Sequence, residues 1–390
     1  GANTYTGTTT INAGDLTVSG SLHDSTAVTI ASGADYNVNA SDTVASIEGA
    51  GNIVIASSQT LTAGDGNDKT LSGVISGAGN YIKAGSGTQT LSASNTYTGT
   101  TQVSAGTLTV SGSGRLSDST AVTVDSGAVY NVAVSDTVAS IAGAGSITLG
   151  SNTLTSGGSD ASTTFSGVIS GTNGNIIKAG TGTLTLTGNN SYTGSTTISA
   201  GLLKIIRDDP TSYLAATSGF TGPGNLTIES SGDDFTADIV TGTHVQLAGT
   251  ALGNLIIGKT GNTRQIDLSS DITTTGTQTY NGPVRLVGGD RTVSTTNSNV
   301  IFASTVNSDG TQRALTVTNG TGDTTFSGAI GGSAPVKSLT ITSDQLTAGA
   351  ITLNGALTAT LGGSSSITGV IANGASTANL VKAGSGTLTL

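Results

Sequence analysis

The segment IKAGTGTLTLTGNNSYTGSTTISA, residues 177–200, decides the fold because versions of it recur along the chain. Its first half reappears as IKAGSGTQTL at 82–91 and as VKAGSGTLTL at 381–390. Its second half reappears as NTYTGTTTINA at 3–13 and as NTYTGTTQVSA at 95–105. Recurrence at long, similar spacings indicates a repeat architecture, so this is a structural signature and not an active site. The sequence begins and ends inside the unit, and we expect it to be a segment of a longer array.

The composition is unusual for a globular chain of 390 residues, with 59 glycines, 3% aromatic and 9% charged residues. Low complexity of this kind is compatible with disorder. The order of the apolar residues argues against disorder, because short runs such as LTV, VTI, ITL and LTL alternate with Thr or Ser and are interrupted by Gly, Asn, Asp or Ser. That alternation predicts short β-strands separated by turns, and no stretch predicts a helix.

Two long segments align almost throughout and are copies of one unit. NTYTG begins at Asn3 and Asn95, and STAVT begins at Ser25 and Ser119. A third, diverged unit returns to the signature at its end. The predicted organisation is repeat unit 1 at 1–92, repeat unit 2 at 93–187 and a diverged unit at 188–390, which carries a loop excursion at 206–224.

The places where the copies differ in length predict which parts are loops. Successive NTYTG or NSYTG motifs are 92 and then 95 residues apart. Two of the extra residues enter where SLHDS (21–25) becomes SGRLSDS (113–119), and one enters where 77–81 becomes 171–176. Insertions are tolerated in surface connections but not in paired strands, so these segments are loops.

These patterns predict an all-β fold, a parallel β-helix forming a single continuous rod, with each coil burying its apolar face on the next. We expect about 23 residues and three strands per coil, hence about four coils per repeat. Thr suits the outer face and Val, Ile and Leu the narrow interior. Val74 and Val168 are also expected inside. The other inward positions predicted in the first unit are Leu16, Val18, Val28, Ile30, Val44, Ile47, Ile53, Ile55, Leu71 and Ile75.

The charge balance excludes some partners. A formal net charge of −10, with only 13 basic residues that are scattered, argues against nucleic acid. No apolar run approaches the roughly 20 residues of a membrane-spanning helix, so we expect no membrane span in this sequence. The absence of Cys suits export through an oxidising compartment.

Residues 1–205 and 367–390 resemble the autotransporter-associated β-strand repeat of bacterial passenger domains. The resemblance rests on NTYTG, TTI, an AG turn and LTV, preceded by KAGTGTLTL. The intervening GTQTYNGPVRL and TTFSGAIGG resemble the shaft regions of filamentous-haemagglutinin-like giant adhesins. The resemblance implies a right-handed parallel β-helix, extracellular or on the bacterial outer surface, that works as a stalk, adhesin or fibre.

The main alternative is a carbohydrate-active β-helix enzyme or a glycan-binding module. Glycoside chemistry needs two carboxyl groups roughly 5–10 Å apart. The available pairs are Asp208–Asp209 and Asp233–Asp234, and adjacent residues on a strand point to opposite faces. We therefore predict no catalytic residues and no enzymatic activity, since fold analogy alone supports the alternative.

Metal and cofactor sites are not predicted either. His23 and His244 lie in unrelated contexts, whereas zinc needs three or four converging ligands. AGDGNDKT at 63–70 resembles a calcium turn, but its counterpart in the second unit keeps only Asp160. Lysines recur in the KAG turn and predict either a basic ligand-binding stripe or, more simply, a solvated corner with a packed stem. These lysines are Lys83, Lys178 and Lys382.

The sequence thus favours a structural shaft or fibre segment that serves adhesion, cell–cell contact or an extracellular biofilm matrix. Expected partners are neighbouring repeats of the same chain or head-to-tail copies, together with surface glycans or proteins. If the segment contacts a specific partner, the excursion at 206–224 is the place, because it holds two of the four prolines and two of the scarce aromatics. The candidate anchors there are Tyr213 and Phe220.

Overall fold

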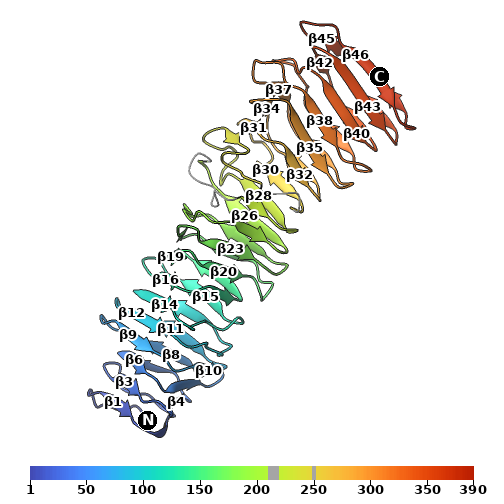
Figure 1. The fold of residues 1–390 in the computed structure, drawn as a ribbon. Helices are drawn as coiled ribbons and strands as arrows, with labels where there is room; N and C mark the ends of the chain where they lie inside the picture. The colour runs from blue at the N-terminus through green and yellow to red at the C-terminus, as the bar shows by residue number, and fades with distance from the viewer. Residues whose placement is uncertain (210–218, 248–251) are drawn as a thin grey trace. The chain divides into compact units, whose positions relative to one another are not determined.

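The computed structural model describes residues 1–209, 219–247 and 252–390 and contains strands but no helix within them (Figure 1). The strands pair in parallel from one coil to the next, as in Thr9↔Val28 and then Val28↔Ile47. The all-β parallel solenoid predicted from the sequence is therefore confirmed. Two compact units, Gly1–Thr196 and Thr197–Leu390, make up the chain. No helical segment of the described residues has the length and apolarity needed to cross a membrane.

The first unit consists of short strands in stacked coils. Its strands are β1 (Thr9–Ile11), β2 (Gly14–Val18), β3 (Ala27–Ile30), β4 (Ala34–Val38), β5 (Asp42–Val44), β6 (Ser46–Gly49), β7 (Asn52–Ile55), β8 (Thr60–Ala63), β9 (Lys69–Leu71), β10 (Ile75–Gly77), β11 (Asn80–Lys83), β12 (Thr88–Leu91), β13 (Thr101–Val103), β14 (Thr107–Val110), β15 (Ala121–Val124), β16 (Val129–Val132), β17 (Asp136–Val138), β18 (Ser140–Gly143), β19 (Ser146–Thr148), β20 (Thr153–Ser156), β21 (Thr163–Phe165), β22 (Val168–Ser170), β23 (Asn175–Lys178) and β24 (Thr183–Leu186). Strand β25 (Thr196–Ile198) lies at the boundary of the two units.

Coils of the first unit are shorter than the sequence predicted. Paired residues lie between 17 residues apart, as in Asp35↔Asn52, and 22 apart, as in Ile53↔Ile75. A repeat of 92 or 95 residues therefore spans between four and five coils instead of four.

Because the repeat is not a whole number of coils, equivalent strands of the two repeats occupy different ladders. Strand β1 lies in the ladder β1-β3-β6-β9-β12-β14-β16-β19-β22, whereas its counterpart β13 pairs with β11 and β15 in another ladder. Likewise β4 belongs to the ladder β2-β4-β7-β10, while its counterpart β16 belongs to the β1 ladder. Repeated surface features therefore face different directions in successive repeats.

Side chains alternate between the interior and the surface along these strands, as the Thr/aliphatic pattern predicted. Nine of the ten predicted inward residues are at most 5% exposed, and Leu16 is half-buried. Val74 is half-buried beside the fully buried Ile75, and Val168 is 38% exposed beside the fully buried Ile169, so the expectation that these two valines point inward is wrong. In β22 the inward position is Ile169 and not Val168, because Ile169 pairs with the buried Ile147 of the previous coil.

Glycines permit the turns that follow several inward strands. Gly49 and Gly77 have φ values of 116° and 97°. A Cβ atom on Gly77 would lie 2.1 Å from the carbonyl oxygen of Ile55 in the previous coil. Both the backbone conformation and the close approach of the coils therefore require glycine there.

The second unit has the same ladder construction with less uniform coils. Its strands are β26 (Leu202–Ile206), β27 (Phe220–Thr221), β28 (Asn225–Glu229), β29 (Ile239–Val240), β30 (Leu255–Ile257), β31 (Ile266–Leu268), β32 (Ile272–Thr274), β33 (Gln278–Tyr280), β34 (Val284–Leu286), β35 (Arg291–Thr295), β36 (Val300–Phe302), β37 (Val306–Ser308), β38 (Leu315–Thr318), β39 (Thr324–Phe326), β40 (Leu339–Ser343), β41 (Leu346–Ala348), β42 (Ile351–Leu353), β43 (Ala356–Leu361), β44 (Ser365–Ile367), β45 (Ile371–Asn373), β46 (Asn379–Ala383) and β47 (Leu388–Thr389).

The longest coil in the second unit is not the excursion expected at 206–224. Paired residues are 23 apart across that excursion, at Leu202↔Asn225, and 29 apart in the next coil, at Leu226↔Leu255. Inside this unit, the rings of Tyr280, Phe302 and Phe326 stack with centroids 5.1 and 4.8 Å apart.

Candidate functional site

The repeat signature forms a joint between two consecutive coils, and the first unit contains it twice. Here "the joint" means the contact between a coil that carries the KAG turn and the following coil that carries NTYTG or NSYTG. The first joint lies within residues 75–105 and the second within residues 169–196. These are the most sharply repeated sequences in the chain, so their side chains show what the signature does.

The asparagine of the signature takes the place of a backbone group in the ladder. Asn95 Oδ1 accepts the N–H of Ile75 in the preceding coil at 2.9 Å, and Asn190 Oδ1 accepts that of Ile169 at 2.8 Å. Asn95 Nδ2 donates to the carbonyl of Arg115 in the next coil at 2.7 Å. Both asparagine residues are at most 5% exposed. Each side chain thus makes a buried hydrogen bond between coils at a position where no strand pairs.

The tyrosine two residues later is buried in the core and its hydroxyl group is paired. Tyr97 and Tyr192 share hydrogen bonds with the hydroxyls of Thr101 and Thr196, at 2.5 and 2.7 Å. Burial raises the pKa of both tyrosines. The spacing Tyr-x-x-x-Thr in the signature thus encodes a buried side-chain pair.

The lysines of the KAG turn bind backbone carbonyls. Lys83 Nζ donates to the carbonyls of Ala84, Gly85 and Ala105 at 2.5, 2.9 and 3.1 Å, and Ala105 belongs to the following coil. Lys178 Nζ donates in the same way to the carbonyls of the two residues that follow it. Burial lowers the pKa of both lysines.

These contacts correct the sequence-based interpretation of the lysines. Lys83 and Lys178 are 1% and 2% exposed, so they form neither a basic stripe nor a solvated corner. They also lie on different ladders, in β11 and β23, because the repeat is not a whole number of coils. The hydrogen bonds to carbonyl oxygens replace those that the ammonium groups lose with water on burial.

A second buried polar pair was not predicted from the sequence. The Tyr36 hydroxyl donates to Asp42 Oδ2 at 2.5 Å, and Asp42 Oδ1 accepts the N–H of Leu22 at 2.9 Å. Tyr130 and Asp136 repeat this arrangement in the second repeat. Burial raises the pKa of Tyr36, Tyr130 and Asp136. The signal was present, because YNV and SDTV recur with the same six-residue spacing from Tyr to Asp.

The acidic residues considered for catalysis act as acceptors for the next coil. Asp208 Oδ1 accepts the N–H of Ser231 at 2.7 Å, and Asp234 accepts the N–H and hydroxyl of Thr263. These hydrogen bonds lower the pKa of both carboxyl groups. Asp160 Oδ1 likewise accepts the N–H of Thr181 in the next coil, and this hydrogen bond lowers the pKa of Asp160. The carboxylates therefore extend the ladders at the corners of the coils.

Other candidate groups lie apart. His23 Nδ1 pairs with Ser25 Oγ at 2.8 Å, and His244 Nδ1 accepts the N–H of Val240 at 3.0 Å within a turn. In the AGDGNDKT turn, Asp65 accepts the N–H of Asn67. Within 1–209, 219–247 and 252–390, no three His, Cys, Asp or Glu side chains gather closely enough to hold a metal ion.

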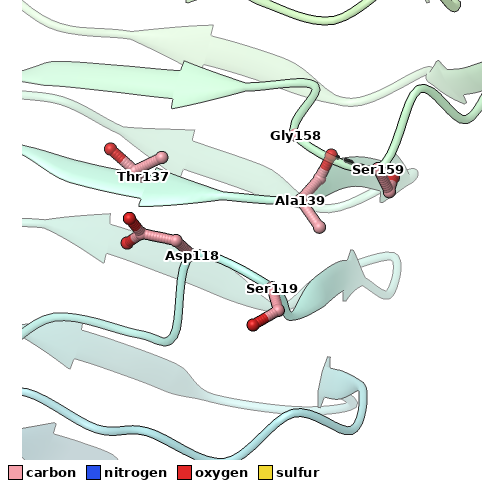
Figure 2. Close-up of a pocket in the computed structure, with 6 residues that line it drawn as sticks. All are labelled: Asp118, Ser119, Thr137, Ala139, Gly158 and Ser159. Atoms are coloured by element: carbon pink, nitrogen blue, oxygen red, sulfur yellow. Dashed lines mark hydrogen bonds between the residues drawn. The ribbon is translucent and has the colours of Figure 1, made fainter.

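An open hollow of about 430 Å³ lies in the first unit over three successive coils (Figure 2). Asp118 and Ser119 of the length-variable loop, Thr137, and Ser159 line it, with Ala139 and Gly158 between them. Ser159 Oγ donates to the Ala139 carbonyl at 3.2 Å. Asp118 is the one carboxylate of this lining, so the hollow does not hold the two carboxyl groups that glycoside hydrolysis requires.

The two candidate partner anchors have different outcomes. Phe220 lies in β27, whose backbone forms a parallel bridge with Leu247 in the next coil, and its side chain is 1% exposed and therefore in the core. It is therefore a core residue and not the surface anchor that we expected. Tyr213 lies outside the described residues.

Comparisons with known proteins agree with the geometry. The model of the passenger-associated-transport-repeat family matches residues 1–18, 82–110, 176–205 and 380–390, which contain the KAG and NTYTG sequences. Over 146 residues the chain is 34% identical to the adhesin BmaC autotransporter of Brucella suis biovar 1 (strain 1330). That alignment covers 35% of this chain and 4% of the Brucella protein, and no solved structure matches. The resemblance seen in the signature is thus confirmed: the chain carries passenger-associated-transport repeats and is similar over part of its length to an autotransporter adhesin.

Proposed function

We propose that this chain is a structural shaft segment of a secreted or surface-displayed bacterial adhesin, located outside the cell. The observation that carries the proposal is the joint, which appears twice: Asn95 Oδ1 accepts the Ile75 N–H in the first copy, and Asn190 Oδ1 accepts the Ile169 N–H in the second. A contact that recurs with the sequence repeat is suited to extending a solenoid by further units. On this proposal the segment has no catalytic role and serves adhesion by displaying other parts of an exported protein.

The distribution of polar chemistry supports the same proposal. Buried lysine, asparagine and tyrosine side chains bind neighbouring coils, and the corner aspartates accept N–H groups of the next coil. Equivalent residues face different directions in successive repeats, so the repeat itself does not build one extended binding face. These features support a role in connecting and spacing.

The test is an in-frame excision of one repeat. Removing residues 95–189 joins the first KAG coil directly to the second NSYTG coil, and the joint formed is equivalent to the two in the native chain. We expect this variant to keep its β circular dichroism spectrum and a cooperative thermal transition. The control, removal of residues 95–179, breaks the phase of the repeat and should disrupt folding. If both variants lost structure equally, the modular shaft would be contradicted. A separate assay addresses the carbohydrate-active alternative, which would be favoured if the native chain released reducing ends from bacterial or host glycans.

A further inference from the structure

A regular grid of hydroxyl groups lies on the outer face of the second unit, over strands β35, β38, β40 and β43 (Figure 1). The four strands are neighbours in one parallel ladder. Each carries two outward hydroxyl residues on either side of a residue that is fully buried. These outward residues, here called the threonine grid, are Thr292, Ser294, Thr316, Thr318, Thr340, Thr342, Thr358 and Thr360.

The register of the ladder aligns the grid in two columns. One column runs through Thr292, Thr316, Thr340 and Thr358, and the other runs through Ser294, Thr318, Thr342 and Thr360. Neighbouring strands of a sheet lie about 4.8 Å apart, and alternate residues of one strand lie about 6.6 Å apart. The hydroxyl groups therefore repeat at fixed distances in two directions. Because threonine is stiff at χ1, the grid is rigid before any ligand arrives.

The hydroxyl groups of the grid are available to a ligand. Ser294 Oγ shares a hydrogen bond with Thr273 Oγ1 at 2.8 Å. The threonine hydroxyls of the grid have no hydrogen-bond partner among the residues that the structure describes. Thr318 is exposed, and the other members are half-buried against one another. The grid thus presents hydroxyl groups that the protein itself does not use.

The β1 ladder of the first unit shows that such a grid is not a general result of the Thr/aliphatic alternation. There the same pattern covers two coils, with Thr88 and Thr90 paired to Thr107 and Thr109. The following coil places Asn131 opposite Thr109, and Asn131 Nδ2 donates to Thr109 Oγ1 at 3.3 Å. Outward side chains of that ladder therefore bind each other where the grid leaves its hydroxyls unpaired.

The chemistry of the grid favours an uncharged lattice as its ligand. Charged side chains beside the grid are occupied, because Arg291 donates to backbone carbonyls and Lys337 pairs with Asp290. The four strands contain no aromatic residue on which a sugar ring could stack. Each threonine offers a hydroxyl group, which both donates and accepts, next to a methyl group. Ordered water matches this combination.

We propose that the threonine grid binds the surface of ice. Oxygen atoms of ice repeat along two perpendicular directions of a crystal face at distances close to those of the grid, so successive hydroxyls can bind successive lattice positions. One such hydrogen bond contributes little in water. A rigid grid forms many of them together and loses little conformational entropy on binding. This binding activity is additional to the shaft role and does not depend on it.

The experiment measures how much of the 390-residue chain enters slowly growing ice. Serum albumin, which growing ice excludes, is the reference. We expect the native chain to be enriched in the ice, and Thr340→Lys to lower that enrichment by about tenfold or more. Thr123→Lys is the matched control, because Thr123 is a half-buried outward residue of β15 in the first unit, and it should keep the native enrichment. Circular dichroism verifies that each variant is folded, and Thr318→Lys replaces Thr340→Lys if the latter unfolds.

Two results would overturn the proposal directly. One is exclusion of the native chain from ice to the same degree as albumin, and the other is equal enrichment of the native chain and the folded grid variant. Binding to microcrystalline cellulose or chitin that the grid variant loses, together with exclusion from ice, would also overturn it and would assign the grid to a carbohydrate lattice. The shaft role is tested separately by the repeat excision, so the two proposals can fail independently.

Discussion

In the first unit, coils of 17–22 residues are linked by buried Asn, Lys and Tyr side chains, whereas coils of 18–29 residues in the second unit enclose a stack of aromatic rings. The cation that binds backbone carbonyls differs as well. It is lysine in the first unit, as at Lys83, whereas Arg291 donates to the carbonyls of Leu268 and Val287 in the second unit. Directional hydrogen bonds need nearly constant geometry between coils, which near-identical repeats provide. Apolar contacts are non-directional and tolerate coils of variable length.

The largest effect is expected from breaking the aromatic stack. Phe302→Ala removes the middle ring from between Tyr280 and Phe326 and should destabilise the second unit by about 3–5 kcal/mol, as large-to-small core substitutions do. Hydrogen exchange measured by mass spectrometry should show faster exchange in the second unit than in the first. Phe302→Leu, which retains most of the volume, is the control and should have a smaller effect. Equal loss of protection in both units would contradict the separate role of the stack.

Removing a lysine of the joint should have a smaller but clear effect. Lys83→Met leaves the carbonyls of Ala84, Gly85 and Ala105 without their donor, and we expect destabilisation of the first unit by about 2 kcal/mol. Lys69→Met is the matched control, because Lys69 makes a partly exposed ion pair with Glu48 that is worth under about 1 kcal/mol. Urea unfolding of both variants measures the difference, and equal midpoints would show that the Lys83 contacts are not stabilising.

Acid should destabilise the second unit more than the first. Hydrogen bonds lower the pKa of four described carboxyl groups in the second unit, namely Asp208, Asp234, Asp290 and Asp309. A carboxyl group with a lowered pKa in the folded state contributes stability above its unfolded pKa, near 4, and this stability is lost as the pH falls through the folded pKa.

The first unit has fewer such groups among its described residues, Asp65 and Asp160, and one with the opposite sign. Burial raises the pKa of Asp136, so its folded form gains stability as the pH falls through that raised pKa. Urea titrations at neutral and acidic pH, monitored by methyl NMR of isoleucines in each unit, measure separately how much free energy of unfolding each unit loses in acid. A greater loss in the first unit would contradict the assignment.

The smallest effect on stability is expected from removing a hydroxyl group that makes no hydrogen bond. Tyr81 is fully buried and its hydroxyl has no partner in the structure. Its counterpart in the second repeat is Ile176, so Tyr81→Phe should be neutral or stabilising. Tyr97→Phe removes the hydrogen bond to Thr101 and should cost about 1 kcal/mol. Thermal melts that rank the two variants in the reverse order would refute this interpretation.

Sequence reasoning located the strands and the interior because both depend on local alternation. Val28, Ile30 and Ile47 could be placed inside from the two-residue period alone. The length-variable loop at 21–25 could be placed because insertions mark loops, and it forms a connection between β2 and β3. Val168 could not be placed, since a three-residue strand flanked by glycines does not define its own phase.

The contacts of the joint were not predictable for a different reason. The third acceptor of Lys83 is Ala105, which is 22 residues away in sequence and adjacent only when the coils stack. Coil length decides the Lys83–Ala105 contact, and the sequence-based value of 23 residues exceeded the 17–22 found in the first unit. The Tyr36–Asp42 pair, which lies outside the joint, joins two strands of one coil across a turn, and the six-residue spacing from Tyr to Asp in both repeats was the signal that could have found it.

The central claim is that the signature side chains connect the coils, and amide exchange at one residue tests it most directly. Asn95→Ala removes the acceptor of the Ile75 N–H, and Asn190→Ala removes that of Ile169. We predict that the Ile75 amide exchanges faster in the Asn95 variant while the Ile169 amide keeps its native rate, and the reverse in the Asn190 variant. Native protection of both amides in both variants would contradict the account.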